Sequence, residues 1–124
     1  MKANELRIGN LVYFEFQNKS VVHKVVPKDI HVMNLCEMEF AKEADCFKPI
    51  QLTENELLKL GFTCDENKMY RNDRICVNWG NWGTVTILGT DGGYAIPFQH
   101  ENQTVHWMQN LYFALTGKEL TYKP

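Results

Sequence analysis

The sequence predicts an α+β fold, with a mainly antiparallel sheet or a small barrel and two helices at about residues 54–60 and 104–116. Short runs of β-branched and aromatic residues, separated by turn-forming residues, are typical of antiparallel strands. Two other segments place apolar residues at helical spacing and have clear start or stop signals. The strands are grouped instead of alternating with the helices, which favours α+β over a parallel α/β fold.

The length and composition are those of one small globular domain. A chain of 124 residues buries roughly two-thirds of its surface on folding, so we expect a single domain over residues 1–124. The net charge of −2 is unlike the basic balance of general polyanion binders. No apolar run approaches the roughly 18 residues that cross a bilayer, and residues 1–5 lack the apolar core of a signal peptide. We therefore expect a cytoplasmic protein with no membrane association.

The first third of the chain is rich in strand-forming residues. Residues 11–16 and 21–26 predict two strands, and the turn-forming residues 17–20 join them as a hairpin. Pro27 ends the second strand because it has no N–H to donate to a ladder. Residues 30–35 alternate apolar and polar side chains and predict a third strand. A glycine before the first strand and the consecutive hairpins resemble the opening of small β-barrels of the Src-homology or KOW type, which is why a barrel is one alternative.

The helix at residues 54–60 has signals at both ends. Thr53 and Glu56 fit a capping box, in which the threonine hydroxyl accepts an amide proton and the glutamate reaches back to the Thr53 amide. Gly61 suits the left-handed position that ends many helices. Together these signals predict a short helix of about two turns.

The rest of the chain predicts further strands and then the second helix. The predicted strands are residues 68–71, 74–78, 84–88 and 94–98. Pro97 favours an edge position for the last of them. Gly117 stops the helix at residues 104–116. The expected packing stripe of this helix consists of Val105, Met108, Leu111, Tyr112 and Leu115.

The other side of the second helix is a candidate binding surface. His106, Gln109, Asn110 and Phe113 are spaced so that they share one side, and they could form a small polar recognition surface. A helix face in contact with solvent has the same spacing, and it is the favoured interpretation.

The loop at residues 79–83 is the second candidate binding element. Trp79 and Trp82, separated by small residues, could stack on a base, a sugar or an apolar patch of a partner. The favoured alternative is that one or both rings close the end of the sheet, because large aromatic side chains are often in the core. Lys68 and Arg71 lie nearby in the sequence, together with Arg74, and would add positive charge for a nucleic acid.

Motifs for catalysis, cofactors and metals are absent from the sequence. It has no nucleophile-elbow, zinc-protease or P-loop spacing, and we predict no catalytic residue and no cofactor. The four cysteines are Cys36, Cys46, Cys64 and Cys76. Because no two of them form a C-x-x-C pair, we expect free thiols and no metal. A mixed site that combines Cys36 and Cys46 with His31 is the alternative.

Three blocks of the sequence carry a family resemblance. They are ELRIGNLV at residues 5–12, PIQLTENELLKLGF at 49–62 and VHWMQNLYFALTGKEL at 105–120. In these blocks the chain resembles an uncharacterised family of small proteins from gut Bacteroidales genomes, prophages and mobile elements. The resemblance implies a phage or mobile-element accessory protein, and it implies no activity, cofactor or catalytic residue.

Three functions stay open at this point. The first is a non-catalytic accessory or protein-interaction module that binds an unknown protein partner. The second is a nucleic-acid-associated accessory protein that uses the Trp79/Trp82 loop. The third is a small enzyme with no recognisable motif. The sequence does not determine the oligomeric state.

Overall fold

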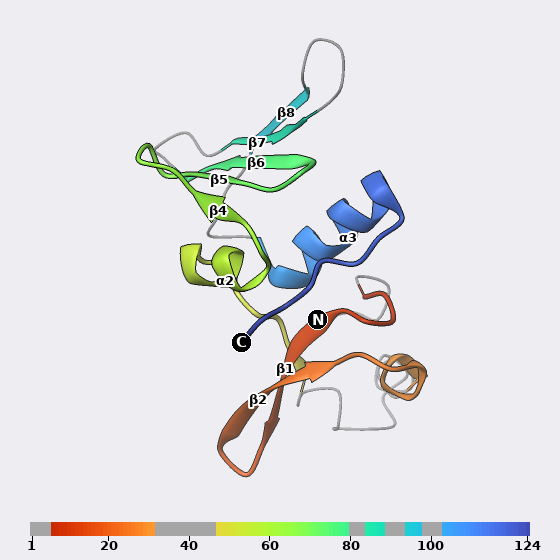
Figure 1. Cartoon of the computed structure of the whole chain (residues 1–124). Helices are drawn as coiled ribbons and strands as arrows, with labels where there is room; N and C mark the ends of the chain where they lie inside the picture. The colour runs from red at the N-terminus through yellow and green to blue at the C-terminus, as the bar shows by residue number, and fades with distance from the viewer. Residues whose placement is uncertain (1–5, 32–46, 80–83, 89–93, 98–102) are drawn as a thin grey trace. The chain divides into compact units, whose positions relative to one another are not determined.

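The computed structural model describes residues 6–31, 47–79, 84–88, 94–97 and 103–124. These residues form an α+β structure with two antiparallel sheets (Figure 1), which confirms the predicted fold class. Within the described ranges both sheets are open, so the barrel alternative is wrong. The chain divides into two compact units, which we name the N-terminal unit (residues 1–50 and 104–106) and the C-terminal unit (residues 51–103 and 107–124). The expectation of one domain over residues 1–124 stays a prediction.

The sheet of the N-terminal unit is built on a tight hairpin. Its strands are β1 (Leu11–Phe16), β2 (Lys19–Lys24) and β3 (Phe47–Lys48), in the order β2-β1-β3. Gln17 and Asn18 have φ angles of 50° and 63° and form a two-residue turn. Positive φ at both central positions is the type I′ geometry, whose twist matches that of the flanking strands. The second strand therefore begins at Lys19, two residues earlier than the pattern predicts.

The core of the N-terminal unit lies on one face of this sheet. Val12, Val25 and Phe47 are buried and contact one another, and the partly buried Leu6, Phe14 and Ile30 pack against them. The rings of Phe14 and Phe47 meet edge to face at 5.3 Å between centroids. Neighbouring strands and the segment after β2 thus contribute to a single small cluster.

Residues 27–31 are helical, so the predicted third strand at residues 30–35 is wrong at its start. Residues 32–35 lie outside the described ranges. Strand β2 ends at Lys24, three residues before Pro27, whose fixed φ and missing N–H suit the first position of a helix. The Asp29 carboxylate accepts a hydrogen bond from the Val26 N–H at 2.8 Å and so caps this helical start. A Pro followed two residues later by Asp was the signal for this helix.

The sheet of the C-terminal unit is a five-stranded antiparallel meander. Its strands are β4 (Thr63–Cys64), β5 (Met69–Arg71), β6 (Ile75–Asn78), β7 (Thr84–Ile87) and β8 (Tyr94–Pro97). They are hydrogen-bonded in chain order, which confirms the four predicted strands and places Pro97 on an edge strand. The central strand β6 is the best buried, with Ile75 and Val77 fully covered. The short strands β3 and β4 have no clear sequence signal.

Helix α2 (Glu54–Lys59) begins and ends where the sequence predicts, within one residue. The Thr53 hydroxyl accepts from the Glu56 N–H at 3.2 Å. The Glu56 carboxylate does not complete the capping box; it accepts from the Tyr122 hydroxyl at 2.9 Å. At the other end, the N–H groups of Gly61 and Phe62 donate to carbonyls inside the helix, as in a Schellman motif, and Gly61 has φ of +90°.

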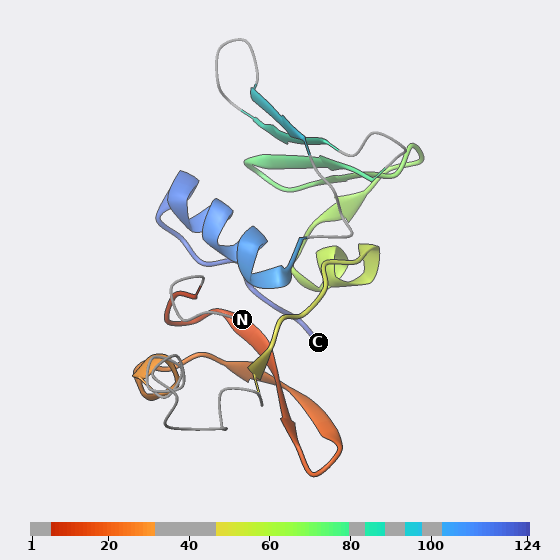
Figure 2. The same ribbon diagram turned by 180° about the vertical axis from the view of Figure 1, so that it is seen from behind.

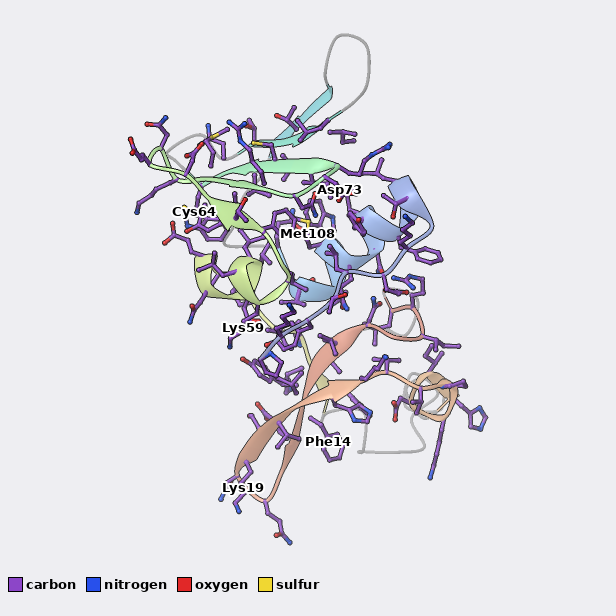
Figure 3. The ribbon with its side chains drawn as sticks, viewed as in Figure 1. Phe14, Lys19, Lys59, Cys64, Asp73 and Met108 are labelled. Atoms are coloured by element: carbon purple, nitrogen blue, oxygen red, sulfur yellow. The ribbon has the colours of Figure 1, made fainter. Side chains whose placement is uncertain are left out.

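Helix α3 (Val105–Thr116) is the second predicted helix and has the predicted end. Gly117 has φ of +71°, and its N–H donates to the Phe113 carbonyl at 2.8 Å. This single bond is the αL form of helix termination. Within the C-terminal unit, α2 and α3 lie on the same side of the sheet in both views (Figures 1 and 2). Met108 is fully buried and points from α3 toward the sheet (Figure 3).

Candidate interaction edge

Strand β2 lies at an edge of the N-terminal sheet. The sheet order is β2-β1-β3, so within the described residues no strand pairs with the outer side of β2. The strand is six residues long and begins at the hairpin turn, next to which Lys19 lies (Figure 3). An edge of this length presents a row of backbone donors and acceptors to which another strand could pair.

The hairpin register identifies the backbone groups that point outward. A two-residue turn makes Phe16 and Lys19 a hydrogen-bonded pair, and such pairs recur at every second residue of an antiparallel ladder. The Val25 N–H donates to the Asn10 carbonyl at 2.8 Å, which extends the same alternation to the other end of the hairpin. The backbone groups of the intervening β2 residues therefore point away from β1. These residues are Ser20, Val22 and Lys24.

The side chains of β2 are more exposed than those of its neighbours. Val21 and Val22 are 54% and 43% exposed, and His23 is the one β2 side chain that is partly buried. Side chains alternate between the two faces, so the exposed valines lie on opposite faces of the same edge. Tyr13 of β1 pairs with Val22 of β2 on one side and with Lys48 of β3 on the other. The edge thus offers apolar surface on both faces.

The N-terminal unit has no net charge over its whole sequence, with seven basic and seven acidic side chains, but its basic residues are concentrated in the described part. Its described residues 6–31 and 47–50 include five basic and two acidic side chains, a net charge of +3, whereas the chain carries −2. Two of the lysines, Lys19 and Lys24, lie at the two ends of β2. The edge is therefore an apolar strip with a positive charge at each end.

The His23 side chain joins β2 to neighbouring parts of the N-terminal unit. The Nε2 atom of His23 lies 2.8 Å from Oδ2 of Asp29, to which it donates a hydrogen bond. The same carboxylate oxygen accepts from the Val26 N–H. The His23 ring also lies 5.9 Å from the ring of Phe14 and 5.8 Å from that of Phe47. These contacts join β2 to the core and to the helical residues 27–31.

The Trp79/Trp82 loop is described only in part. Trp79 is partly exposed and lies edge-on to the buried Tyr70, with 6.3 Å between ring centroids. Trp82 lies outside the described residues, so the stacking pair stays a prediction. Two of the three cations expected near this loop have acidic partners: Lys68 lies 3.8 Å from a Glu54 carboxylate oxygen, and Arg71 lies 3.6 Å from one of Asp65. Both pairs weaken the positive field expected around this loop.

The polar side of α3 does not face solvent as the favoured interpretation expected. His106 and Gln109 are 5% and 2% exposed. Asn110 is partly buried, and only Phe113 of the four candidates is exposed. The buried residues of the helix are Val105, His106, Met108, Gln109 and Tyr112. A binding role for the four candidates stays a prediction.

Tyr112 accounts for this orientation of α3. Its hydroxyl donates to Oδ1 of Asp73, in the turn between β5 and β6, at 2.9 Å. Anchoring Tyr112 to the sheet brings Met108 and Gln109 to the buried side, because residues three and four apart share a helix face. Leu111 and Leu115, which we expected in the stripe, are only partly buried.

Two buried tyrosines have altered acidity. Burial, and then the neighbouring Cys64 thiol and Glu54 carboxylate, raise the pKa of Tyr70 above its ordinary value. Burial and the hydrogen bond to Asp73 likewise raise the pKa of Tyr112. Both phenols are therefore neutral donors at neutral pH.

The cysteines and the metal alternative are only partly described. Cys64 and Cys76 are free thiols, exposed and buried respectively, as predicted. Cys36 and Cys46 lie outside the described residues, and His31 is exposed. The described residues contain no group of three or more His, Cys, Asp or Glu side chains that could hold a metal ion.

The position of β2 at an edge was the functional feature that the sequence interpretation missed. Two adjacent valines between lysines were the available signal, because side chains next to each other in a strand lie on opposite faces. In the described part of the chain no helix has the length and apolar character needed to cross a membrane. Comparison with known proteins gives no match: no protein-family model, no curated protein and no solved structure is significantly similar to this chain.

Proposed function

We propose that the protein is a non-catalytic protein-interaction module and that it binds its partner along the edge of β2. The observation that carries this proposal is the exposure of Val21 and Val22 on an edge strand whose outward backbone groups have no strand partner among the described residues. Its role as an accessory protein of a phage or mobile element is supported by the sequence resemblance alone.

A strand added at this edge would gain apolar burial and backbone hydrogen bonds. Burying a valine side chain completely contributes about 1.5–3 kcal/mol, and roughly half of each of these two valines is exposed. Each backbone hydrogen bond with an added strand contributes about 0.5–1.5 kcal/mol net. These gains must exceed an association cost of about 4–15 kcal/mol, so we expect an interaction that extends beyond the edge or is transient.

The test is affinity capture of the full chain from its native host after nuclease treatment, followed by mass spectrometry. We compare the natural chain with Val22→Pro, which removes an outward N–H and leaves the hydrogen bonds to β1 in place. The matched control is Leu58→Thr, which removes an exposed apolar side chain from α2, in the other unit. We expect a protein that is retained by the natural chain and the control and lost with Val22→Pro.

Two results would overturn the proposal. Retention of the same partner by Val22→Pro would show that the edge is not the binding surface. A protein that is retained only when the nuclease is omitted, and that is lost with Trp79→Ala, would instead support the nucleic-acid alternative.

A further inference from the structure

We propose that β2 takes up an extended, acidic segment of the partner protein as an added strand. This inference rests on the proposed function and names the chemistry of the partner. The three outward-facing residues, Ser20, Val22 and Lys24, each offer one N–H and one C=O along the open edge. A strand that pairs with them continues the sheet on the far side of β2.

The side chains on the edge specify the composition of the added strand. Directly opposite residues in neighbouring strands have their side chains in contact, so a β-branched residue suits the position opposite Val22. The positions opposite Lys19 and Lys24 suit Asp or Glu. Lys48 adds a third positive charge on the face that carries Val22 and Lys24, two strands away. The preferred segment therefore has β-branched residues at its centre and a carboxylate at each end.

The same lysines oppose pairing between two copies of this chain. A twofold antiparallel pairing about Val22 would bring Lys19 and Lys24 of both copies along one short edge. In that pairing each Lys24 lies opposite a Ser20 and each Lys19 opposite a Val25, so neither lysine meets a carboxylate, and lysines on edge strands commonly prevent such association. Charge thus favours an acidic partner over a second copy of this chain, although both could form the same backbone hydrogen bonds.

The test uses fluorescence anisotropy of labelled peptides titrated with the full chain at low and at physiological salt. The acidic probe is Gly-Glu-Thr-Val-Val-Thr-Glu-Gly, whose central six residues read the same in both directions and so suit parallel or antiparallel pairing. The matched basic probe replaces both glutamates with lysine. We expect the acidic probe to bind at least tenfold more tightly, and Lys24→Glu in the protein to reduce or reverse that preference.

Two further measurements test strand addition itself. Val22→Pro should weaken the acidic probe at least tenfold, with an unchanged far-ultraviolet circular dichroism spectrum as the control for folding. Methylating the two valine amides of the acidic probe should weaken binding to the natural chain to the same degree, and this measurement does not depend on a variant that folds. Binding that survives amide methylation would overturn strand addition.

The peptide experiment and the capture experiment fail in different ways. Equal affinity for the acidic and basic probes would overturn the acidic partner, even where capture still yields a protein that is lost with Val22→Pro. Capture of a second copy of this chain as the sole partner would also overturn it. Capture that is insensitive to Val22→Pro would overturn the proposed function as well.

Discussion

Replacing Asp29 with alanine should destabilise the N-terminal unit, because this side chain accepts two hydrogen bonds there. The substitution removes two hydrogen bonds of 2.8 Å, one from the Val26 N–H and one from His23. The first is a helix cap, worth about 1 kcal/mol. The second joins a His side chain that is 34% exposed to a carboxylate that is 14% exposed, so solvent screening reduces it to about 0.5 kcal/mol. We expect a loss of about 1.5 kcal/mol in the free energy of unfolding.

Urea unfolding followed by far-ultraviolet circular dichroism measures this loss. With an m-value of about 2 kcal/mol/M, the midpoint should fall by roughly 0.7 M. The three tryptophans, at positions 79, 82 and 107, all lie in the C-terminal unit, so their fluorescence reports that unit separately. A midpoint that falls by dichroism and not by fluorescence would show that the N-terminal unit unfolds by itself.

Asp29→Asn is the matched variant, because both hydrogen bonds go to one carboxylate oxygen and an amide oxygen can take its place. It should cost less than half as much as Asp29→Ala. Two results would refute this reasoning. One is an alanine variant whose free energy of unfolding lies within about 0.3 kcal/mol of that of the natural chain, as for an ordinary surface change. The other is an asparagine variant that is as destabilised as the alanine variant. Since His23 is part of β2, the alanine variant should also weaken binding of the acidic peptide.

Three further predictions concern the C-terminal unit. Tyr112→Phe removes the hydrogen bond to Asp73 and should lower the unfolding free energy by about 1 kcal/mol, measured by tryptophan fluorescence in urea; an unchanged midpoint would contradict the anchoring role. The pKa values of Tyr70 and Tyr112 are raised in the folded state, which therefore favours the neutral phenols. The two tyrosines should contribute fully to the free energy of unfolding below about pH 10, and this contribution should disappear as the pH rises through their pKa values in the folded protein. Thermal unfolding between pH 8 and 11 tests this, and a melting temperature equally constant in the natural chain and the Tyr112→Phe variant would contradict it. Gly117→Ala should cost about 1 kcal/mol from backbone strain alone, because φ is +71° and an added Cβ meets nothing within 4 Å; a stabilised variant would contradict the αL ending of α3.

The ends of the helices could be predicted from the sequence because they depend on contacts within a few residues. The Thr53 cap, the Gly61 ending and the Gly117 ending are all made by neighbours in the chain. The strands of the C-terminal unit were predictable for a similar reason, since tight turns separate runs of strand-forming residues. The helical residues 27–31 were missed because the sequence interpretation used Pro27 only to end a strand and not to begin a helix.

The candidate edge could not be predicted in the same way. Its strand was expected, but a sequence does not state whether a strand lies at the edge or the centre of a sheet. The outward direction of the Val22 backbone groups follows from the pairing register, and the partial burial of His23 follows from its contacts with Asp29, Phe14 and Phe47. The side of α3 that is buried was ambiguous as well, because polar and apolar residues adjoin on its surface.

The sequence by itself determined the fold class, the two longer helices and the turns that separate most strands, since periodicity and local hydrogen bonding are written in neighbouring residues. Only the tertiary structure decided that β2 lies at an edge with valines exposed on both faces, and that His106 and Gln109 of α3 are buried. The physical reason is that burial and strand pairing depend on segments far apart in the chain. Tyr112 and Asp73, separated by 39 positions, orient α3 by a single hydrogen bond that no local pattern contains.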